Sequence, residues 1–356
     1  MTSPHSPSTP SDPWAAPPAA STPSDPWAAP PAGPYPPYAP YPYEPEPPYV
    51  SPPLPYHRLA LVTGRHRWWR PVAGTALVLG GAVAAALLVL LGAEIAGAAL
   101  GKPVDKDGLR VWGGIGQMAQ GLLSLALLLP VVFLAARWVQ RRPGGTVSSV
   151  VGRLRWDWLV RCLLLALPLV AASLGVMLLL PGASGDGTDD MVWAGLPDFL
   201  LGLAMVCVLV PFQAAAEEYV FRGWLTQAVG AWCRSPWVAI LPQAPLFAAA
   251  HGWGTPWGFL DLVVFALVTG VLTLRTGGLE AAIGLHLISN LLAMGLSAAI
   301  AGALASDETA ADMDAVSVCV DVVMICGYAA LVLWWAGRRK VEAVGTGRTA
   351  DDGDDR

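Results

Sequence analysis

The chain has 356 residues, of which 54% are hydrophobic and 13% are charged, and its mean hydropathy is +0.52. Soluble proteins carry about 25% charged residues, so a soluble globule of this composition could not cover its surface. The composition therefore predicts an integral membrane protein. The net charge of −5 and the lack of a basic domain give no basis for a nucleic-acid partner. The five cysteines include no Cys-x-x-Cys pair, so neither a disulfide framework nor a thiolate zinc site is indicated.

The N-terminal part, residues 1–60, is predicted to be a disordered tail. Residues 1–56 hold 21 of the 33 prolines, and the string STPSDPWAAPPA occurs at 8–19 and again at 21–32. Such a segment cannot bury a core, and its prolines favour extended polyproline-II conformations. It is either a docking arm for a proline-recognising partner or a low-complexity extension without a specific partner, and the second interpretation is favoured.

Eight apolar runs follow the tail. A membrane span needs about 20 residues, because about 30 Å of hydrocarbon is crossed at 1.5 Å per residue. The fifth run is short and carries Pro242 and Pro245. The sequence thus predicts an all-α polytopic helical bundle with about eight transmembrane helices. The runs are at 72–94, 112–138, 158–181, 197–220, 236–252, 257–274, 278–303 and 316–336.

The basic residues alternate between the predicted loops. With the N-terminus in the cytoplasm, the outside loops contain only three basic residues, Lys102, Lys106 and Arg110. This pattern satisfies the positive-inside rule and predicts a multi-pass cell-membrane protein with both termini cytoplasmic. The inside segments hold Arg65, Arg67, Arg70, Arg137, Arg141, Arg142, Arg153, Arg155, Arg222, Arg234, Arg275, Arg338, Arg339 and Lys340.

Ionisable groups within the apolar runs are costly and need an explanation. The fourth run ends with Glu217 and Glu218, followed by Arg222. Arg222 lies four residues after Glu218 and can pair with it on one helix face, whereas it reaches Glu217 less well. Glu217 without a local counter-ion suits a general base. The alternative is that both glutamates are ordinary charges at a helix end.

Two histidines and the single asparagine of the chain lie on the next runs. The fifth run gives Phe247-x-x-x-His251, and the seventh gives His286-x-x-x-Asn290. His286 and Asn290 are four residues apart and therefore share a helix face. Packing of a lone histidine, or polar contacts between helices, are the alternatives to catalysis. Three polar clusters on consecutive helices favour a functional site.

This series of motifs resembles the CPBP family, the CAAX protease and bacteriocin-processing enzymes, which includes the type II CAAX prenyl endopeptidases. The motifs are Glu-Glu-x-x-x-Arg, Phe-x-x-x-His and His-x-x-x-Asn, within residues 211–292. Each motif is weak alone, but the three in order on membrane helices are specific. The resemblance implies a catalytic core over 195–300. Outside it, the sequence predicts the tail 1–60, three spans over 61–190, and a last span with an acidic tail over 301–356.

The resemblance implies an intramembrane endopeptidase that acts on a membrane-associated peptide or protein, either a prenylated C-terminus or a bacteriocin-like peptide. By motif position, Glu217 would activate the attacking water with the help of His286. His251 and Asn290 would stabilise the oxyanion, Glu218 would pair with Arg222, and Phe247 would give structural support. Deprotonated water and oxyanion donors are what amide hydrolysis requires.

A zinc ion held by Glu217, His251 and His286 is the alternative to metal-free water activation, since relatives are often described as metalloproteases. The chain has no His-Glu-x-x-His motif, and Glu217 cannot easily be both ligand and base, so metal-free activation is favoured.

The predicted helices raise one geometric difficulty. A regular helix from Pro236 would place His251 roughly 22 Å from the helix start, while Glu217 is predicted near the cytoplasmic end of its own helix. The groups could not then meet. Either the fifth helix is broken at Pro242 and Pro245, or the predicted boundaries are displaced.

Two other functions are open. A non-catalytic membrane scaffold or immunity protein would retain the fold without the activity. A transporter would also bury carboxylates and histidines, but it predicts inverted repeats that the sequence does not show.

Overall fold

The computed structural model describes residues 53–179, 192–306 and 308–345. The regular structure of these residues is helical apart from one pair of two-residue strands and a few isolated bridges. This confirms the predicted all-α membrane bundle. The predicted repeat at 8–19 and 21–32 lies outside the described residues.

Seven helical segments of the described chain are long and apolar enough to cross a membrane. In the apolar 18-residue stretch of the first segment, α1, only 11% of the residues are buried inside the protein, against 50% in the corresponding stretch of α9. The apolar surface of α1 is therefore left for lipid, which is the environment that such a surface requires. The first three spans are α1 (Arg70–Ala99), a composite of α2 (Gly113–Ala126), α3 (Leu128–Leu134) and π-helical η2 (Ala135–Val139), and α4 (Trp156–Leu179).

The other four spans surround the polar motifs. The fourth continues without interruption from an α-helix through a π-helical turn into a further short helix. These spans are α5 (Leu196–Glu218) with η5 (Tyr219–Leu225) and α6 (Thr226–Gly230), α9 (Pro256–Thr276), α10 (Glu280–Ser297) and α11 (Ala315–Arg339).

The expected fifth span is not one long helix. It consists of α7 (Pro236–Ile240) and α8 (Gln243–Ala250), which together are shorter than the seven spans. Pro242 stands between them and Pro245 lies in the first turn of α8. A proline has no N–H to donate and restricts the residue before it, so the break falls where the sequence predicts it.

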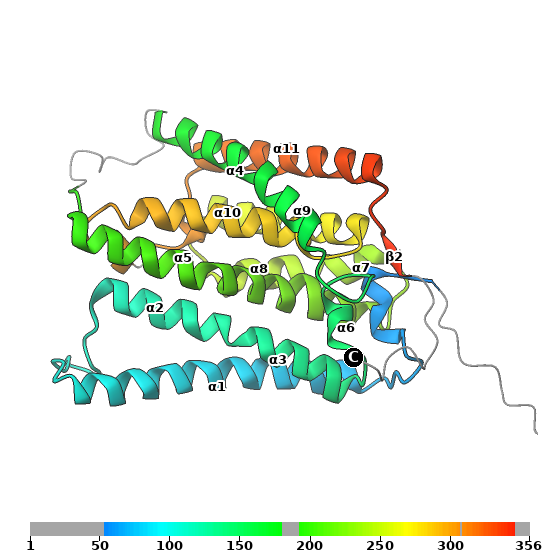
Figure 1. Ribbon diagram of the computed structural model, residues 1–356, viewed down its shortest axis with the longest axis horizontal. Helices are drawn as coiled ribbons and strands as arrows, with labels where there is room; N and C mark the ends of the chain where they lie inside the picture. Colours follow the sequence, from blue (N-terminus) through cyan, green and yellow to red (C-terminus); the bar gives the residue numbers. More distant parts are fainter. Residues whose placement is uncertain (1–52, 180–191, 307, 346–356) are drawn as a thin grey trace, which may run out of the picture. The chain divides into compact units, whose positions relative to one another are not determined.

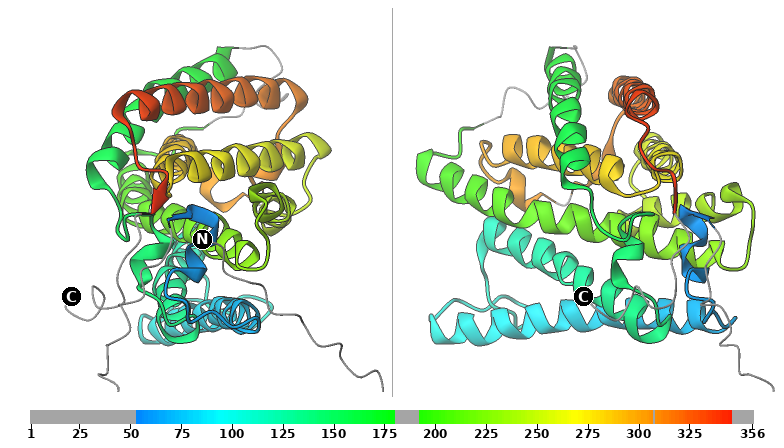
Figure 2. Two further views of the ribbon diagram at one scale, coloured as in Figure 1. Left: turned by 90° about the vertical axis from the view of Figure 1, so that its right-hand side faces the viewer. Right: turned by 45° about the vertical axis from the view of Figure 1, so that its right-hand side comes forward.

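The helices of the described bundle lie in layers (Figures 1 and 2). From the bottom to the top of Figure 1, α1 is followed by α2 and α3, then by α5, and then by α10. Helices α4 and α11 lie at the top. Helix α10 packs against α4, α5 and α9, so the helix that carries His286 and Asn290 is central. Its N-terminal half is buried throughout, from Glu280 to His286.

One end of the bundle is fastened by polar contacts between distant segments. Arg155 precedes α4 and donates to both carboxylate oxygens of Glu280 at the start of α10, from Nε at 2.9 Å and from Nη2 at 2.6 Å. The same guanidinium donates to the carbonyls of Thr276 and Glu342. Arg155 therefore joins the ends of α9, α10 and α11.

Three short 3-10 turns lie in the loops between the helices. Turn η3 (Gly144–Val147) precedes α4, and η6 (Ala303–Ala305) and η7 (Ala310–Asp312) lie between α10 and α11.

The segment before α1 differs from the sequence expectation, which assigns residues up to 60 to the tail. Strand β1 (Leu54–Pro55) pairs antiparallel with β2 (Val344–Gly345), and η1 (Tyr56–Leu61) follows it. Tyr56 is fully buried, and its hydroxyl donates to the carbonyl of Val147. The composition of the tail hides this packing because it comes from a few buried side chains at the end of the proline-rich segment, Tyr56, His57, Leu59 and Ala60.

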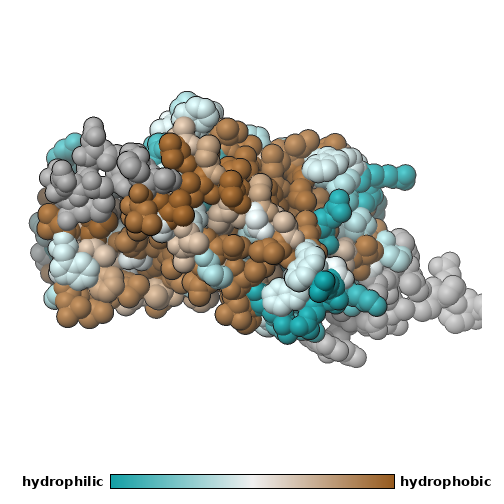
Figure 3. Space-filling view, turned by 90° about the horizontal axis from the view of Figure 1, so that it is seen from above, coloured by the Kyte–Doolittle hydropathy of each residue, from teal (hydrophilic) through white to brown (hydrophobic). Residues whose placement is uncertain are grey.

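Surface hydropathy agrees with a membrane-spanning bundle. In the view of Figure 3, hydrophobic residues cover most of the described surface, and the strongly hydrophilic ones gather toward one end. The starts of α1 and α4 and the end of α11, which carry Arg70, Arg155 and Arg339, are the basic helix ends of the sequence pattern. The assignment of this end to the cytoplasm rests on the positive-inside rule and stays a prediction.

Candidate active site

The helix that carries the glutamate pair is longer than the sequence predicts. The predicted span ends at residue 220, but the helical segment runs to Gly230. Glu217 therefore lies 13 residues, or about 20 Å, before the end of the helix. The helix therefore extends past the predicted boundary, because the charged residues Glu218 and Arg222 after Glu217 are buried in the protein and do not end it. The π-helical turn η5 begins two residues after Glu217, and such turns often accompany functional sites.

A buried ion pair forms the inner side of the site. Arg222 Nη1 lies 3.1 Å from Glu218 Oε1, as the spacing of four residues predicts, and both side chains are fully buried. Arg222 Nε donates to Thr269 Oγ1 on α9 at 3.0 Å. The guanidinium also lies 4.0 Å from the ring centroid of Phe247. Contacts from three elements thus stabilise one buried cation, because a charge removed from water needs both a partner and hydrogen bonds.

Glu218 connects this pair to the next polar group. His286 Nδ1 lies 2.7 Å from Glu218 Oε1. A carboxylate only accepts, so Nδ1 carries the hydrogen and His286 Nε2 points the other way. Arg222, Glu218 and His286 therefore form one continuous polar chain from η5 to α10.

Glu217 faces both histidines. Its Oε2 lies 3.8 Å from His251 Nε2 and 3.7 Å from His286 Nε2, and it has no hydrogen-bond partner among the described residues. His251 Nδ1 donates to the carbonyl of Phe247 at 2.9 Å, which leaves its Nε2 toward the glutamate. The structure thus brings together the three side chains that the sequence could only place on separate helices.

Asn290 reaches Glu217 through another residue. Asn290 Nδ2 donates to Gln213 Oε1 at 3.1 Å, and Gln213 Nε2 donates to Glu217 Oε1 at 2.7 Å. Gln213 is 3% exposed and lies one turn before Glu217 on α5. Its amide therefore fixes one carboxylate oxygen and leaves the other toward the histidines.

The predicted depth conflict is resolved by both explanations together. The fifth helix is broken, and His251 follows the last residue of α8 rather than lying within a regular helix. The boundary of the fourth span is also displaced, so Glu217 is deep in the bundle. The site is most open at His251, whose side chain is 22% exposed, against 9% for Glu217 and 4% for His286.

The arrangement can be compared with the needs of a zinc ion. Two ligands at about 2.0–2.1 Å from one tetrahedral zinc lie about 3.3 Å apart. The separations between Glu217 Oε2 and the two histidine nitrogens are wider, at 3.8 and 3.7 Å. Within the described ranges, no three His, Cys, Asp or Glu side chains are placed to hold a metal ion. The donors as they stand do not fit the zinc alternative.

Two residues of this site are absent from the sequence prediction. Gln213 and Thr269 are neutral polar side chains that are buried in apolar helices and bonded to charged members of the site. Gln213 carries a usable sequence signal, because a glutamine one turn before an intramembrane glutamate shares its helix face. Thr269 has no such signal, since threonines are common on membrane helices and bond to their own backbone.

Comparisons with known proteins identify a family for the segment that holds these residues. A family model described as "Type II CAAX prenyl endopeptidase Rce1-like" matches residues 197–292, which include all of the site residues. The uncharacterized protein YyaK of Bacillus subtilis is 28% identical over 170 residues, or 46% of this chain and 55% of YyaK. An uncharacterized 24.3 kDa protein of Escherichia coli is 31% identical over 176 residues, or 48% of this chain and 76% of the relative. The chain thus spans about half the length of YyaK, and no solved structure matches it significantly.

The fold and the site define a multi-pass helical membrane protein with a carboxylate and histidine cluster inside its bundle. The chain belongs to the Rce1-like type II CAAX prenyl endopeptidase family.

Replacing Thr269 by valine tests the support of Arg222. The change keeps the shape of the side chain but removes the acceptor of the buried Arg222 Nε, at a cost of about 1–3 kcal/mol. We expect a lower thermal midpoint of the purified protein in detergent. Thr273→Val is the matched control, because Thr273 lies one turn later on α9 and its hydroxyl is buried without a partner among the described residues. Equal midpoints for the two variants would contradict the role of Thr269.

Proposed function

We propose that this protein is an intramembrane endopeptidase that hydrolyses a peptide bond with a water activated by Glu217. The observation that carries the proposal is the unpartnered Glu217 Oε2, which faces two imidazole nitrogens at 3.8 and 3.7 Å in the interior of the described bundle. At these separations, a water molecule between Glu217 Oε2 and either imidazole nitrogen lies within hydrogen-bond distance of both atoms. Family membership supports a peptidase, and the site supplies a base and several hydrogen-bond donors.

The two histidines differ in their Nδ1 partners, and this difference assigns their roles. His251 donates to a neutral carbonyl, so its Nε2 lone pair is free to hold the water beside Glu217. An oxyanion donor instead needs a hydrogen on Nε2, and thus a positive ring. His286 lies between Glu217 and Glu218, whose negative charges offset that charge. We therefore assign His251 to the water and His286 to the oxyanion, which exchanges the roles that the family resemblance implied.

Asn290 completes the oxyanion site in this proposal. It lies one turn after His286 on the same face of α10 and is only partly buried, so its amide can reach a bound peptide. Water attacks the carbonyl carbon as its proton passes to Glu217, and the resulting oxyanion accepts bonds from His286 and Asn290. The C–N bond then breaks, and Glu217 returns the proton to the leaving amine.

The substrate class follows from the location of the site. A base about 20 Å from the helix end, within an apolar bundle, favours a peptide that is held in the membrane. We propose a membrane-associated peptide or protein, with a prenylated C-terminus or a bacteriocin-like peptide as the two classes to test. A scaffold or immunity protein without activity is the competing function.

The variant Glu217→Gln tests the activity directly. It keeps the shape and the contact to Gln213 but cannot take a proton, so we expect cleavage of a prenylated peptide by the purified protein to fall by about 10²–10⁴-fold. Glu308→Gln, on an exposed loop, serves as the control and should retain full activity. Undiminished cleavage by Glu217→Gln would refute the assignment, and complementation of a cellular phenotype by the same variant would favour a scaffold.

The positioning role of Gln213 makes a separate prediction. Gln213→Leu removes the donor to Glu217 and the acceptor of Asn290, so we expect kcat to fall by about 10–100-fold with little change in KM. Gln243→Leu is the matched control, since Gln243 is equally buried but donates only to the carbonyl of Ala266. If both variants lower kcat equally, the effect is structural and Gln213 does not position the base.

Metal-free water activation predicts that a zinc chelator leaves the rate unchanged. Purified protein would be incubated with a strong chelator, exchanged into metal-free buffer and assayed with the same peptide. A loss of activity that added zinc restores would contradict metal-free catalysis and would require Glu217 and the two histidines to move closer together.

A further inference from the structure

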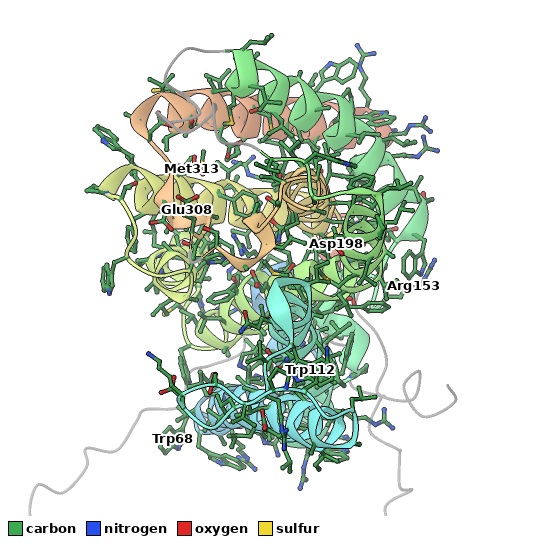
Figure 4. The ribbon with its side chains drawn as sticks, turned by 90° about the vertical axis from the view of Figure 1, so that its left-hand side faces the viewer. Trp68, Trp112, Arg153, Asp198, Glu308 and Met313 are labelled. Atoms are coloured by element: carbon green, nitrogen blue, oxygen red, sulfur yellow. The ribbon has the colours of Figure 1, made fainter. Side chains whose placement is uncertain are left out.

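A cavity lined by arginines lies away from the proposed peptidase site, at the end of the bundle where Arg155 joins the helix ends. The cavity there has a volume of about 400 Å³ and lies between the start of α4 and the end of α11. Four arginines contribute to its wall, namely Arg153, Arg155, Arg161 and Arg339. Figure 4 shows Arg153 at the periphery of the bundle, so the cavity is at the outside of the described protein.

Three of these arginines have no counter-ion among the described residues. Arg155 is paired with Glu280, but Arg153, Arg161 and Arg339 form no ion pair there. Two carboxylates, Asp157 and Glu342, also line the cavity without pairing with an arginine. With Arg155 neutralised by Glu280, the remaining wall has a net formal charge of +1.

One residue of the wall carries a buried hydrogen-bond donor that has no partner among the described residues. Trp158 lines the cavity and is 4% exposed, yet its indole N–H has no hydrogen-bond partner in the described structure. Its ring packs edge-on against Trp335 at 6.0 Å, and Trp335 in turn lies 5.7 Å from the guanidinium of Arg161. A buried donor without an acceptor is costly, so a ligand oxygen that reaches this N–H would offset the cost.

The surroundings of the cavity favour a lipid as the source of that acceptor. The outer faces of the two helices beside it are apolar and exposed, with Val160 and Leu164 on α4 and Leu331 and Trp334 on α11. Acyl chains can lie along such a surface, while the headgroup reaches the arginines at the helix ends. Basic cavities between transmembrane helices bind anionic headgroups in this manner.

We propose that this cavity binds the phosphate of an anionic phospholipid headgroup. The phosphodiester brings one negative charge to a wall with a net formal charge of +1, and its oxygens accept from the free arginines and from the Trp158 indole. The site does not use Glu217 or the histidines, so it is independent of the peptidase proposal.

The experiment measures lipid binding to the purified full-length protein in neutral detergent by native mass spectrometry. Phosphatidylglycerol and phosphatidylcholine are titrated in parallel, and we expect tighter binding of the first phosphatidylglycerol molecule. Arg339→Gln should weaken that binding by about fivefold, since one basic residue contributes about that factor. Arg338→Gln is the matched control, because Arg338 is the exposed neighbour that stacks on Trp334 and does not line the cavity.

A second variant and a competition experiment with inorganic phosphate complete the test. Trp158→Phe removes the indole N–H without changing the charge and should also weaken phosphatidylglycerol binding. Arg339 is exposed, so its variant is expected to fold, and the thermal midpoint checks this. Equal binding of both lipids, or equal weakening by Arg338→Gln and Arg339→Gln, would overturn the proposal. If inorganic phosphate at similar concentrations displaced the lipid fully, the site would bind free phosphate and not specifically a phospholipid headgroup.

Discussion

The structure around the site depends on one constraint, which is that Arg222 is charged and fully buried in an apolar bundle. A buried guanidinium is stable only when a carboxylate and several hydrogen-bond or aromatic partners surround it. Glu218, Thr269 and Phe247 supply these partners from η5's own helix, from α9 and from α8. The same requirement brings His286 to Glu218, and so it fixes how the broken fifth segment and α10 approach the glutamate helix.

The two adjacent glutamates have opposite surroundings because of this constraint. Glu218 Oε1 is paired with Arg222 and His286, whereas Glu217 has Oε1 bonded to Gln213 and forms no ion pair with an arginine among the described residues; the Oε2 atom of each carboxylate has no hydrogen-bond partner there. A base must hold a proton that it can also release, so the carboxylate that is not paired with the arginine is the better candidate. The ion pair therefore does not take part in the proposed chemistry directly, but it decides which glutamate is available for it.

The arginines at the end of the bundle illustrate a different use of charge. Arg155 forms an ion pair with Glu280 and donates hydrogen bonds to carbonyls of α9 and of the segment after α11. These contacts hold three helix ends together. Arg153, Arg161 and Arg339 lie around the same cavity without ion-pair partners among the described residues. The positive-inside pattern of the sequence thus contains both structural arginines and arginines that can meet a lipid, and only their contacts separate the two kinds.

The sequence by itself determined the all-α membrane class and the pairing of Arg222 with Glu218, because these follow from composition and helical spacing. It offered the break near Pro242 as one of two alternatives, from proline chemistry. It did not determine the end of the helix that carries Glu217, since the charged residues Glu218 and Arg222 interrupt the apolar run although they are buried. It also missed the packing of Tyr56, Thr269 and Gln213, which depends on partners far along the chain. Only the tertiary structure decided that His251 and His286 face the same oxygen of Glu217, because that distance is set by how three separate helices pack.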